Sequence, residues 1–220
     1  MTVSDNLYTP DRRAILEAAL IEADFGGWSL ETLRAAADKA GVARERQRLA
    51  FPRGVLDLIE FYSATADAAM IESLKGHELA AMKVRERVTL AVRLRIEALA
   101  AHKPAARAAL HHLAAPLFAG EGLKLLYRTV DTIWRAIGDT STDFNFYSKR
   151  TLLAGVYAST LWTWTEDMCE DGTKTWAFLD RRIENVMGIE KAKAGLRGAL
   201  AKFPDPLKIL SALRYPDKRT

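Results

Sequence analysis

The sequence contains little cysteine and no long apolar run, and each shortage excludes a class of protein. Cys169 is the single cysteine in 220 residues, which excludes an internal disulfide and fits a reducing compartment. No stretch of about 18 apolar residues occurs, so we expect no membrane-spanning helix. Residues 1–13 carry two aspartates and no apolar core, unlike a secretory or transit peptide. We therefore expect a cytoplasmic protein.

Sequence motifs for catalysis and metal binding are also missing. Neither Glu-x-x-His nor His-Glu-x-x-His occurs, and there is no cysteine pair for zinc and no glycine-rich phosphate loop. His111 and His112 are adjacent, so on a helix they would point roughly 100° apart and share a metal poorly. Cys169 lies among acidic residues, which raises a thiol pKa and disfavours a nucleophile. We predict no enzyme, no cofactor and no metal site.

Apolar residues recur at helical spacing along nearly the whole chain, and no segment alternates with period two. The stripe over 123–137 is the clearest, and Gly120-Glu121-Gly122 before it looks like a helix-breaking turn. Caps and breakers delimit the other helices. We expect the first of them to run from Pro10 to Gly26. The others should cover 30–40, 43–50, 54–74, 83–101, 104–115, 143–167 and 174–189. The fold class is therefore all-α.

Residues 29–52 have the layout of a helix-turn-helix at the start of a larger bundle. The segment resembles TetR-type repressors through Gly41-Val42 and Phe51, although Ala43 replaces the usual serine and Arg48 the usual tyrosine. Arg44, Arg46 and Arg48 are candidate DNA contacts, or a solvated face.

Residues 1–52 carry seven basic and eight acidic side chains, and this net charge of −1 argues against DNA as a partner. A ligand-responsive transcriptional regulator of TetR type remains the alternative function. We divide the chain into a helix-turn-helix-like segment (9–53), a helical bundle (54–190) and a basic tail (191–220).

Four further segments resemble the coenzyme Q biosynthesis protein nine family. They are GDTSTDFNFYSKR at 138–150, TWAFLDRRI at 175–183, LLYRTVDTIW at 125–134 and GWSL at 27–30. The resemblance covers roughly residues 12–193. It implies a TetR-like fold that binds isoprenoid quinone intermediates of ubiquinone biosynthesis and presents them to the di-iron demethoxyubiquinone hydroxylase. It also implies that the protein is not itself an enzyme.

One helix face carries the residues to which the resemblance assigns hydroxylase docking. Asp143, Phe146, Tyr147 and Arg150 are spaced i, i+3, i+4 and i+7, and aromatic and arginine side chains are common in binding hot spots. Many family members have tryptophan where this chain has Phe146. The alternative is that Phe146 and Tyr147 pack in the core and Asp143 caps the helix.

A lipid pocket also follows from the resemblance, because spacing alone predicts only a core. The apolar residues that we expect to line it lie on two neighbouring helices, and they are Val130, Ile133, Trp134, Val156, Tyr157, Leu161 and Trp164. Small residues between them, at Ala154, Gly155, Ala158 and Ser159, would leave room between the helices.

The C-terminal tail is the candidate membrane-binding element. Residues 191–220 hold eight basic and two acidic side chains, a net charge of +6, which leaves −2 for residues 1–190. Residues 206–215 read as a short amphipathic helix that would lie on an anionic membrane surface. Its candidate contacts are Leu207, Lys208, Leu210, Leu213 and Arg214. The helix could instead pack on the bundle or on a second subunit. We expect a homodimer, peripherally associated with the inner membrane.

Overall fold

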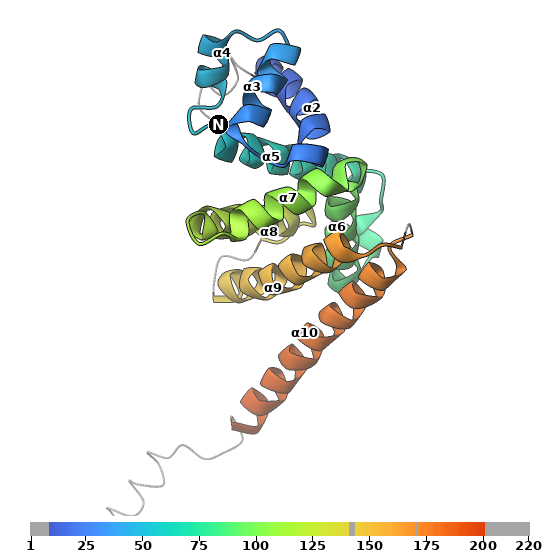
Figure 1. Ribbon diagram of the computed structural model, residues 1–220. Coiled ribbons are helices and arrows are strands. Elements are labelled where there is room, and N and C mark those ends of the chain that lie inside the picture. Colours follow the sequence, from blue (N-terminus) through green and yellow to red (C-terminus); the bar gives the residue numbers. More distant parts are fainter. Residues whose placement is uncertain (1–8, 141–143, 170, 201–220) are drawn as a thin grey trace, which may run out of the picture. The chain divides into compact units, whose positions relative to one another are not determined.

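The computed structural model describes residues 9–140, 144–169 and 171–200, and in these residues the only regular elements are helices (Figure 1). The all-α prediction is thereby confirmed. The chain divides into two compact units, residues 1–180 and residues 181–220. The predicted membrane-binding helix at 206–215 lies outside the described residues.

Three helices form the N-terminal segment, and they start where the sequence places caps and turns. They are α2 (Thr9–Gly26), α3 (Leu30–Lys39) and α4 (Arg44–Ala50). The side chain of Ser29 accepts a hydrogen bond of 3.0 Å from the Thr32 backbone N–H, the expected N-cap of α3. The segment thus has the predicted helix-turn-helix order.

Seven further helical elements follow. They are α5 (Val55–Leu74), η1 (Leu79–Ala81), α6 (Val84–Glu97), η2 (Ala100–His102), α7 (Lys103–Ala114), α8 (Ala119–Ala136) and α9 (Phe144–Glu166). The last described element, α10, spans Thr173–Leu200 and therefore crosses the boundary between the two units.

Three hydrogen bonds hold the N-terminal segment against the start of α7 and the residue before it. The indole N–H of Trp28 donates to the Ala105 carbonyl over 2.8 Å. The Asp24 carboxylate accepts hydrogen bonds from the Ala105 N–H and from His102 Nδ1. Because Ala105 lies in the first turn of α7, Asp24 satisfies a backbone donor that the helix leaves unpaired.

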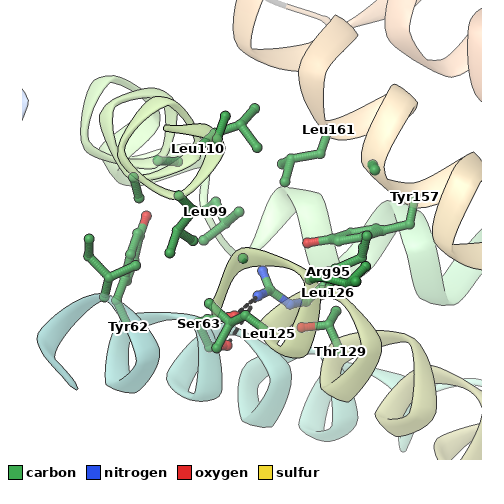
Figure 2. A pocket seen from close by; sticks show the side chains of 18 of the residues that line it. Tyr62, Ser63, Arg95, Leu99, Leu110, Leu125, Leu126, Thr129, Tyr157 and Leu161 are labelled. Carbon is green, nitrogen blue, oxygen red and sulfur yellow. Dashed lines mark hydrogen bonds between the residues drawn. The ribbon is translucent and has the colours of Figure 1, made fainter. Parts of the chain in front are cut away.

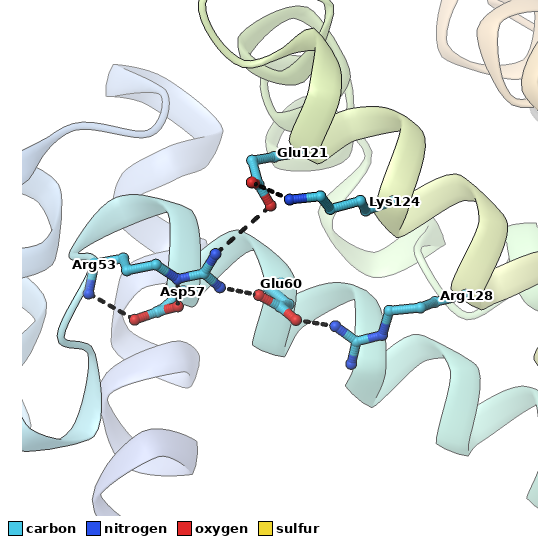
Figure 3. Close-up of polar contacts among 6 residues, drawn as sticks. All are labelled: Arg53, Asp57, Glu60, Glu121, Lys124 and Arg128. Carbon is cyan, nitrogen blue, oxygen red and sulfur yellow. Dashed lines mark hydrogen bonds and ion pairs between the residues drawn. The ribbon is translucent and has the colours of Figure 1, made fainter.

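A network of ion pairs connects the start of α5 to α8 (Figure 3). The Arg53 guanidinium contacts Asp57, Glu60 and Glu121, and the last distance is 3.6 Å. Arg128 contacts Glu60, and Lys124 contacts Glu121 over 2.8 Å. The residue that follows the helix-turn-helix is thus tied to the helix that carries the clearest apolar stripe.

The expected helix-breaking turn at Gly120-Glu121-Gly122 is wrong, because α8 already begins at Ala119. The Gly122 residue has a packing role instead. A β-carbon there would lie 2.9 Å from the Leu113 carbonyl oxygen and 3.2 Å from its β-carbon. Glycine therefore lets α8 approach the end of α7 more closely than any other residue would.

The predicted end of the helix at residue 189 is also too early. Helix α10 continues to Leu200, through a stretch rich in alanine, lysine and leucine. These residues have high helix propensity, and no proline occurs between Thr173 and Pro204. The glycines at 188, 195 and 198 do not end the helix.

We predict opposite effects of alanine at the two glycines of α8. Gly122→Ala would force α7 and α8 apart and lower the free energy of unfolding by about 1–2 kcal/mol. Gly120→Ala meets no atom within 4 Å and would raise it by up to about 1 kcal/mol through helix propensity. Urea denaturation of both variants measures the difference, and equal effects would contradict the close approach.

Candidate functional site

A cavity of about 330 Å³ lies among α5, α6, α7, α8 and α9 (Figure 2). Its wall is mostly aliphatic, with leucines supplied by α7, α8 and α9 together with Leu99. Small residues leave the space open, and they are Ala106, Ala109, Ala114, Ala119, Gly122 and Ala158. The volume lies in the range of pockets that bind small organic ligands.

One charged side chain interrupts the apolar wall. Arg95 of α6 is only 2% exposed, and its Nε donates to Asp67 of α5. Its Nη2 donates to the hydroxyl of Ser63 over 2.9 Å and to the Ser63 carbonyl over 3.1 Å. Thr129 of α8 donates its hydroxyl to the same Asp67 carboxylate over 3.1 Å. This polar group joins three of the helices that surround the cavity.

Burial controls the protonation of the groups around Arg95. Desolvation raises the pKa of the Asp67 carboxyl, although the Arg95 charge and the hydrogen bonds from Arg95 and Thr129 oppose the rise. Desolvation also raises the pKa of the Tyr62 and Tyr157 hydroxyls, both of which line the cavity. Phenols are neutral at physiological pH, and these shifts keep both of them protonated to still higher pH, so both can donate hydrogen bonds.

Two of the seven predicted lipid-binding residues, Tyr157 and Leu161, line the cavity. Four others pack away from it as buried core, namely Val130, Ile133, Trp134 and Val156. The remaining one, Trp164, borders a second hollow next to Lys103 and Asp167. Of the small residues, Ala158 lines the cavity and Ala154, Gly155 and Ser159 do not.

Sequence reasoning missed Arg95 and the contributions of α5 and α7. A signal for Arg95 was present, because it lies seven residues after Val88 and three after Val92. It therefore occupies the apolar stripe of its helix, where an arginine is unusual. No comparable signal marks the α5 and α7 residues, since spacing does not show which helices adjoin.

The four predicted partner-binding residues are placed differently from one another. Tyr147 is 64% exposed, and the half-buried Phe146 contacts it edge to face at 5.1 Å between ring centroids. Arg150 is only 2% exposed and pairs with Asp131 over 2.8 Å. Its guanidinium carbon also lies 3.4 Å from the centre of the Phe146 ring, so Arg150 supports Phe146 from within. Asp143 lies outside the described residues.

His111 and His112 pack against aromatic rings, and Cys169 lies beside Asp167. His111 stacks on Trp162 at 5.3 Å and His112 on Phe118 at 4.5 Å. A hydrogen bond to Asp167 and desolvation raise the pKa of the Cys169 thiol, as its acidic neighbours predicted. The described part of the chain contains no cluster of three or more residues able to hold a metal ion.

Among the arginines of the helix-turn-helix, Arg46 forms an ion pair within the protein. Arg46 donates to both oxygens of Asp11 in α2, over 2.7 and 2.8 Å, and Arg44 and Arg48 are exposed. The planar fork that would read a guanine or a phosphate is therefore engaged at Arg46.

No helix among residues 9–140, 144–169 and 171–200 is long and apolar enough to cross a membrane.

The arrangement of helices defines the class of fold first. The structure superposes on a TetR transcriptional regulator from Nitrosomonas europaea with a TM-score of 0.64 and 22% sequence identity. The alignment covers 80% of this chain and 97% of that chain. The prediction of a TetR-like helical fold is thereby confirmed.

The sequence then identifies the relatives. Residues 119–190 match the family described as COQ9. Ubiquinone biosynthesis protein COQ9 from Rattus norvegicus is 30% identical over 80% of this chain and 58% of its own length. COQ9-B from Xenopus laevis is 31% identical over 80% of this chain and 62% of its own length. The human COQ9 protein is 28% identical over 80% of this chain and 57% of its own length.

The chain is a homologue of the COQ9 proteins, as its motifs predicted. It spans about three fifths of the length of these relatives, all of which are named as mitochondrial proteins. The matched residues 119–190 include α8 and α9, which supply the cavity wall from Ala119 to Leu161 and the aromatic pair at 146–147.

A buried carboxylate near Cys169 gives a pH-dependent prediction. Asp167 is 4% exposed and accepts hydrogen bonds from the Thr175 hydroxyl, the Cys169 N–H and the Thr175 N–H. These bonds lower its pKa to about 2. Because the folded pKa lies below the unfolded one, the stabilisation is complete above about pH 4 and disappears toward pH 2.

We therefore expect Asp167→Asn to lower the free energy of unfolding by about 2 kcal/mol at pH 6. The difference from the wild type should shrink as the pH falls from 4 to 2, in urea denaturation followed by tryptophan fluorescence. Asp180→Asn, at an exposed position, is the control and should change little. A deficit in Asp167→Asn that stays constant down to pH 2 would disprove the role of the charge.

Proposed function

We propose that the chain is a non-enzymatic lipid-binding accessory protein of ubiquinone biosynthesis. It binds an isoprenoid quinone intermediate in the cavity among α5 to α9 and presents it to the di-iron demethoxyubiquinone hydroxylase. The observation that carries this proposal is the apolar cavity itself, in a homologue of proteins named for ubiquinone biosynthesis. An isoprenoid chain matches an aliphatic wall because its burial removes apolar surface from water.

The aromatic pair Phe146 and Tyr147 supports a docking surface on α9. An exposed tyrosine beside a half-buried aromatic ring is typical of a binding hot spot. The Arg150 guanidinium lies against the Phe146 ring, and Arg150 is itself almost completely buried, so it leaves no surface for a partner to contact. The proposed surface therefore consists of the two rings, with Arg150 as a positioning residue. Asp143 belongs to it on sequence grounds alone.

Membrane contact is the third part of the proposal and rests on the sequence. The net charge of +6 in residues 191–220 and the amphipathic pattern at 206–215 suit an anionic bilayer surface. Peripheral attachment would bring the cavity to the membrane in which an isoprenoid lipid dissolves. A homodimer, as in TetR-type proteins, is proposed on the likeness of fold.

The second candidate function is a ligand-responsive DNA-binding regulator, and the likeness to a TetR regulator favours it. The Arg46–Asp11 pair and the net charge of −1 in residues 1–52 oppose it. Salt-sensitive binding to random duplex DNA, measured by fluorescence anisotropy, would support the regulator. Its absence at low salt would support the lipid protein.

The cavity can be filled from within to test lipid binding. Ala158→Phe places a ring at the wall of the cavity, whereas Ala154→Phe places the same ring one turn earlier on α9, away from it. We expect wild-type protein to retain an isoprenoid quinone or its precursor in native mass spectrometry. Ala158→Phe should retain at least tenfold less and Ala154→Phe about as much as the wild type.

A wild-type protein without lipid would contradict the proposal, and so would equal retention by all three proteins. Circular dichroism of each variant checks that the fold is intact.

The docking surface gives a separate prediction. Tyr147→Ala should weaken binding to the demethoxyubiquinone hydroxylase at least tenfold, because hot-spot tyrosines contribute more than about 1.4 kcal/mol. Its effect on thermal stability should be small, since the side chain is exposed. Leu49→Ala on α4 removes an exposed apolar side chain elsewhere and is the matched control. The affinities are measured by surface plasmon resonance. Equal affinities of the two variants would contradict a docking surface on α9.

A further inference from the structure

The Arg95 guanidinium carries an unused hydrogen-bond donor in the wall of the cavity. Its Nη1 is buried and has no hydrogen-bond partner among the described residues, although Nε and Nη2 are both engaged. A buried donor without an acceptor is costly, and more so when it belongs to a charged group. The cost is explained if an acceptor arrives from outside the chain.

The two engaged nitrogens fix the direction of the third. Asp67 holds Nε and Ser63 holds Nη2, so the planar guanidinium cannot turn without breaking both contacts. Figure 2 shows the dashed bonds to Ser63 on one side of Arg95 and the open cavity on the other, toward Leu110 and Leu161. The free corner of the guanidinium thus faces the space that a ligand would occupy.

The charges around Arg95 restrict the charge that an acceptor group of the ligand can carry. Asp67 pairs with Arg95 inside the protein, and Thr129 adds a neutral donor, so the buried group has no net charge. An anionic ligand would add an uncompensated negative charge near the Asp67 carboxylate, which burial penalises. A neutral carbonyl or ether oxygen adds no charge and can accept the bond.

We propose that Arg95 is a specificity-determining residue, whose Nη1 donates a hydrogen bond to a neutral oxygen acceptor at one end of an otherwise apolar ligand. The inference rests on the proposed function of the cavity and adds the chemistry that it selects. A hydrocarbon of the same size leaves Nη1 unpaired, and a carboxylate of the same size brings the wrong charge. The preferred ligand therefore combines an aliphatic or aromatic body with a carbonyl or ether group.

Three probes with eleven carbons each separate these cases. Pentylbenzene is the hydrocarbon, valerophenone replaces one methylene group by a carbonyl, and 4-butylbenzoate carries a carboxylate. Their dissociation constants are measured by displacement of the fluorescent probe 1-aminoanthracene from the full chain. We expect the wild type to bind valerophenone at least tenfold more tightly than either of the other two.

Two variants test the role of Arg95, and the first of them leaves no lone buried charge. Arg95→Met combined with Asp67→Asn removes both charges, and such neutral replacements of buried ion pairs are often tolerated. In this double variant pentylbenzene should bind at least as tightly as valerophenone. Asp67→Asn alone keeps the Nη1 donor but leaves a net positive charge, so the preference should shift at least tenfold from valerophenone toward 4-butylbenzoate.

The outcomes separate the inference from the proposed function. If 1-aminoanthracene and all three probes fail to bind the wild type, the cavity takes no apolar ligand and both proposals are overturned. If the probes bind but the wild type does not prefer valerophenone, the role of Arg95 is overturned while the lipid cavity stands. A preference for valerophenone that persists in the double variant likewise overturns the role of Arg95.

Discussion

The buried ion pair between Arg95 and Asp67 is the interaction on which the rest of the structure depends. It connects α6 to α5, and through Thr129 it connects both to α8. An ion pair removed from water contributes little net stability, but breaking it by removal of one partner is strongly destabilising. The pair therefore fixes how three helices meet, and the cavity is the space that this arrangement leaves beside them.

The size of residues on facing helices determines how that space is shaped. Gly122 allows α8 to approach Leu113 closely at one end of the cavity, while leucines and alanines from α7 to α9 complete an aliphatic wall. The network around Arg53 ties the same helix, α8, to the segment that follows the helix-turn-helix. In this TetR-like fold, ion pairs therefore connect the residue that follows the N-terminal helices to a helix of the cavity wall.

Much of the fold could be predicted from the sequence, because helix periodicity, caps and prolines are local signals. Ser29 capped α3, and Lys103–Ala114 formed a helix at Pro104, as expected. Predictions failed where tertiary packing overrides a local preference. Glycine usually interrupts a helix, but Gly122 lies within α8 and allows its close contact with Leu113. The cavity was harder, because apolar spacing identifies buried residues without showing which helices face one another. Val130 and Ile133 therefore looked like pocket residues and are packed core.

Spacing in the sequence is equally unable to show where polar side chains of one helix face will lie. Arg150 shares a predicted helix face with Tyr147, yet Asp131 draws it into the interior while Tyr147 stays exposed. Only the three-dimensional arrangement shows that Arg95, which lies on an apolar stripe, has one guanidinium nitrogen without a hydrogen-bond partner.

The central claim is that an isoprenoid quinone occupies the cavity among α5 to α9. Photocrosslinking tests it most directly, with a short-chain ubiquinone analogue that carries a diazirine on its isoprenoid tail and with labelled residues identified by peptide mass spectrometry. The account predicts labelling concentrated at wall residues such as Leu110, Leu126 and Leu161, suppressed by an excess of unmodified quinone. Labelling spread over the exposed surface, or unaffected by the competitor, would contradict it.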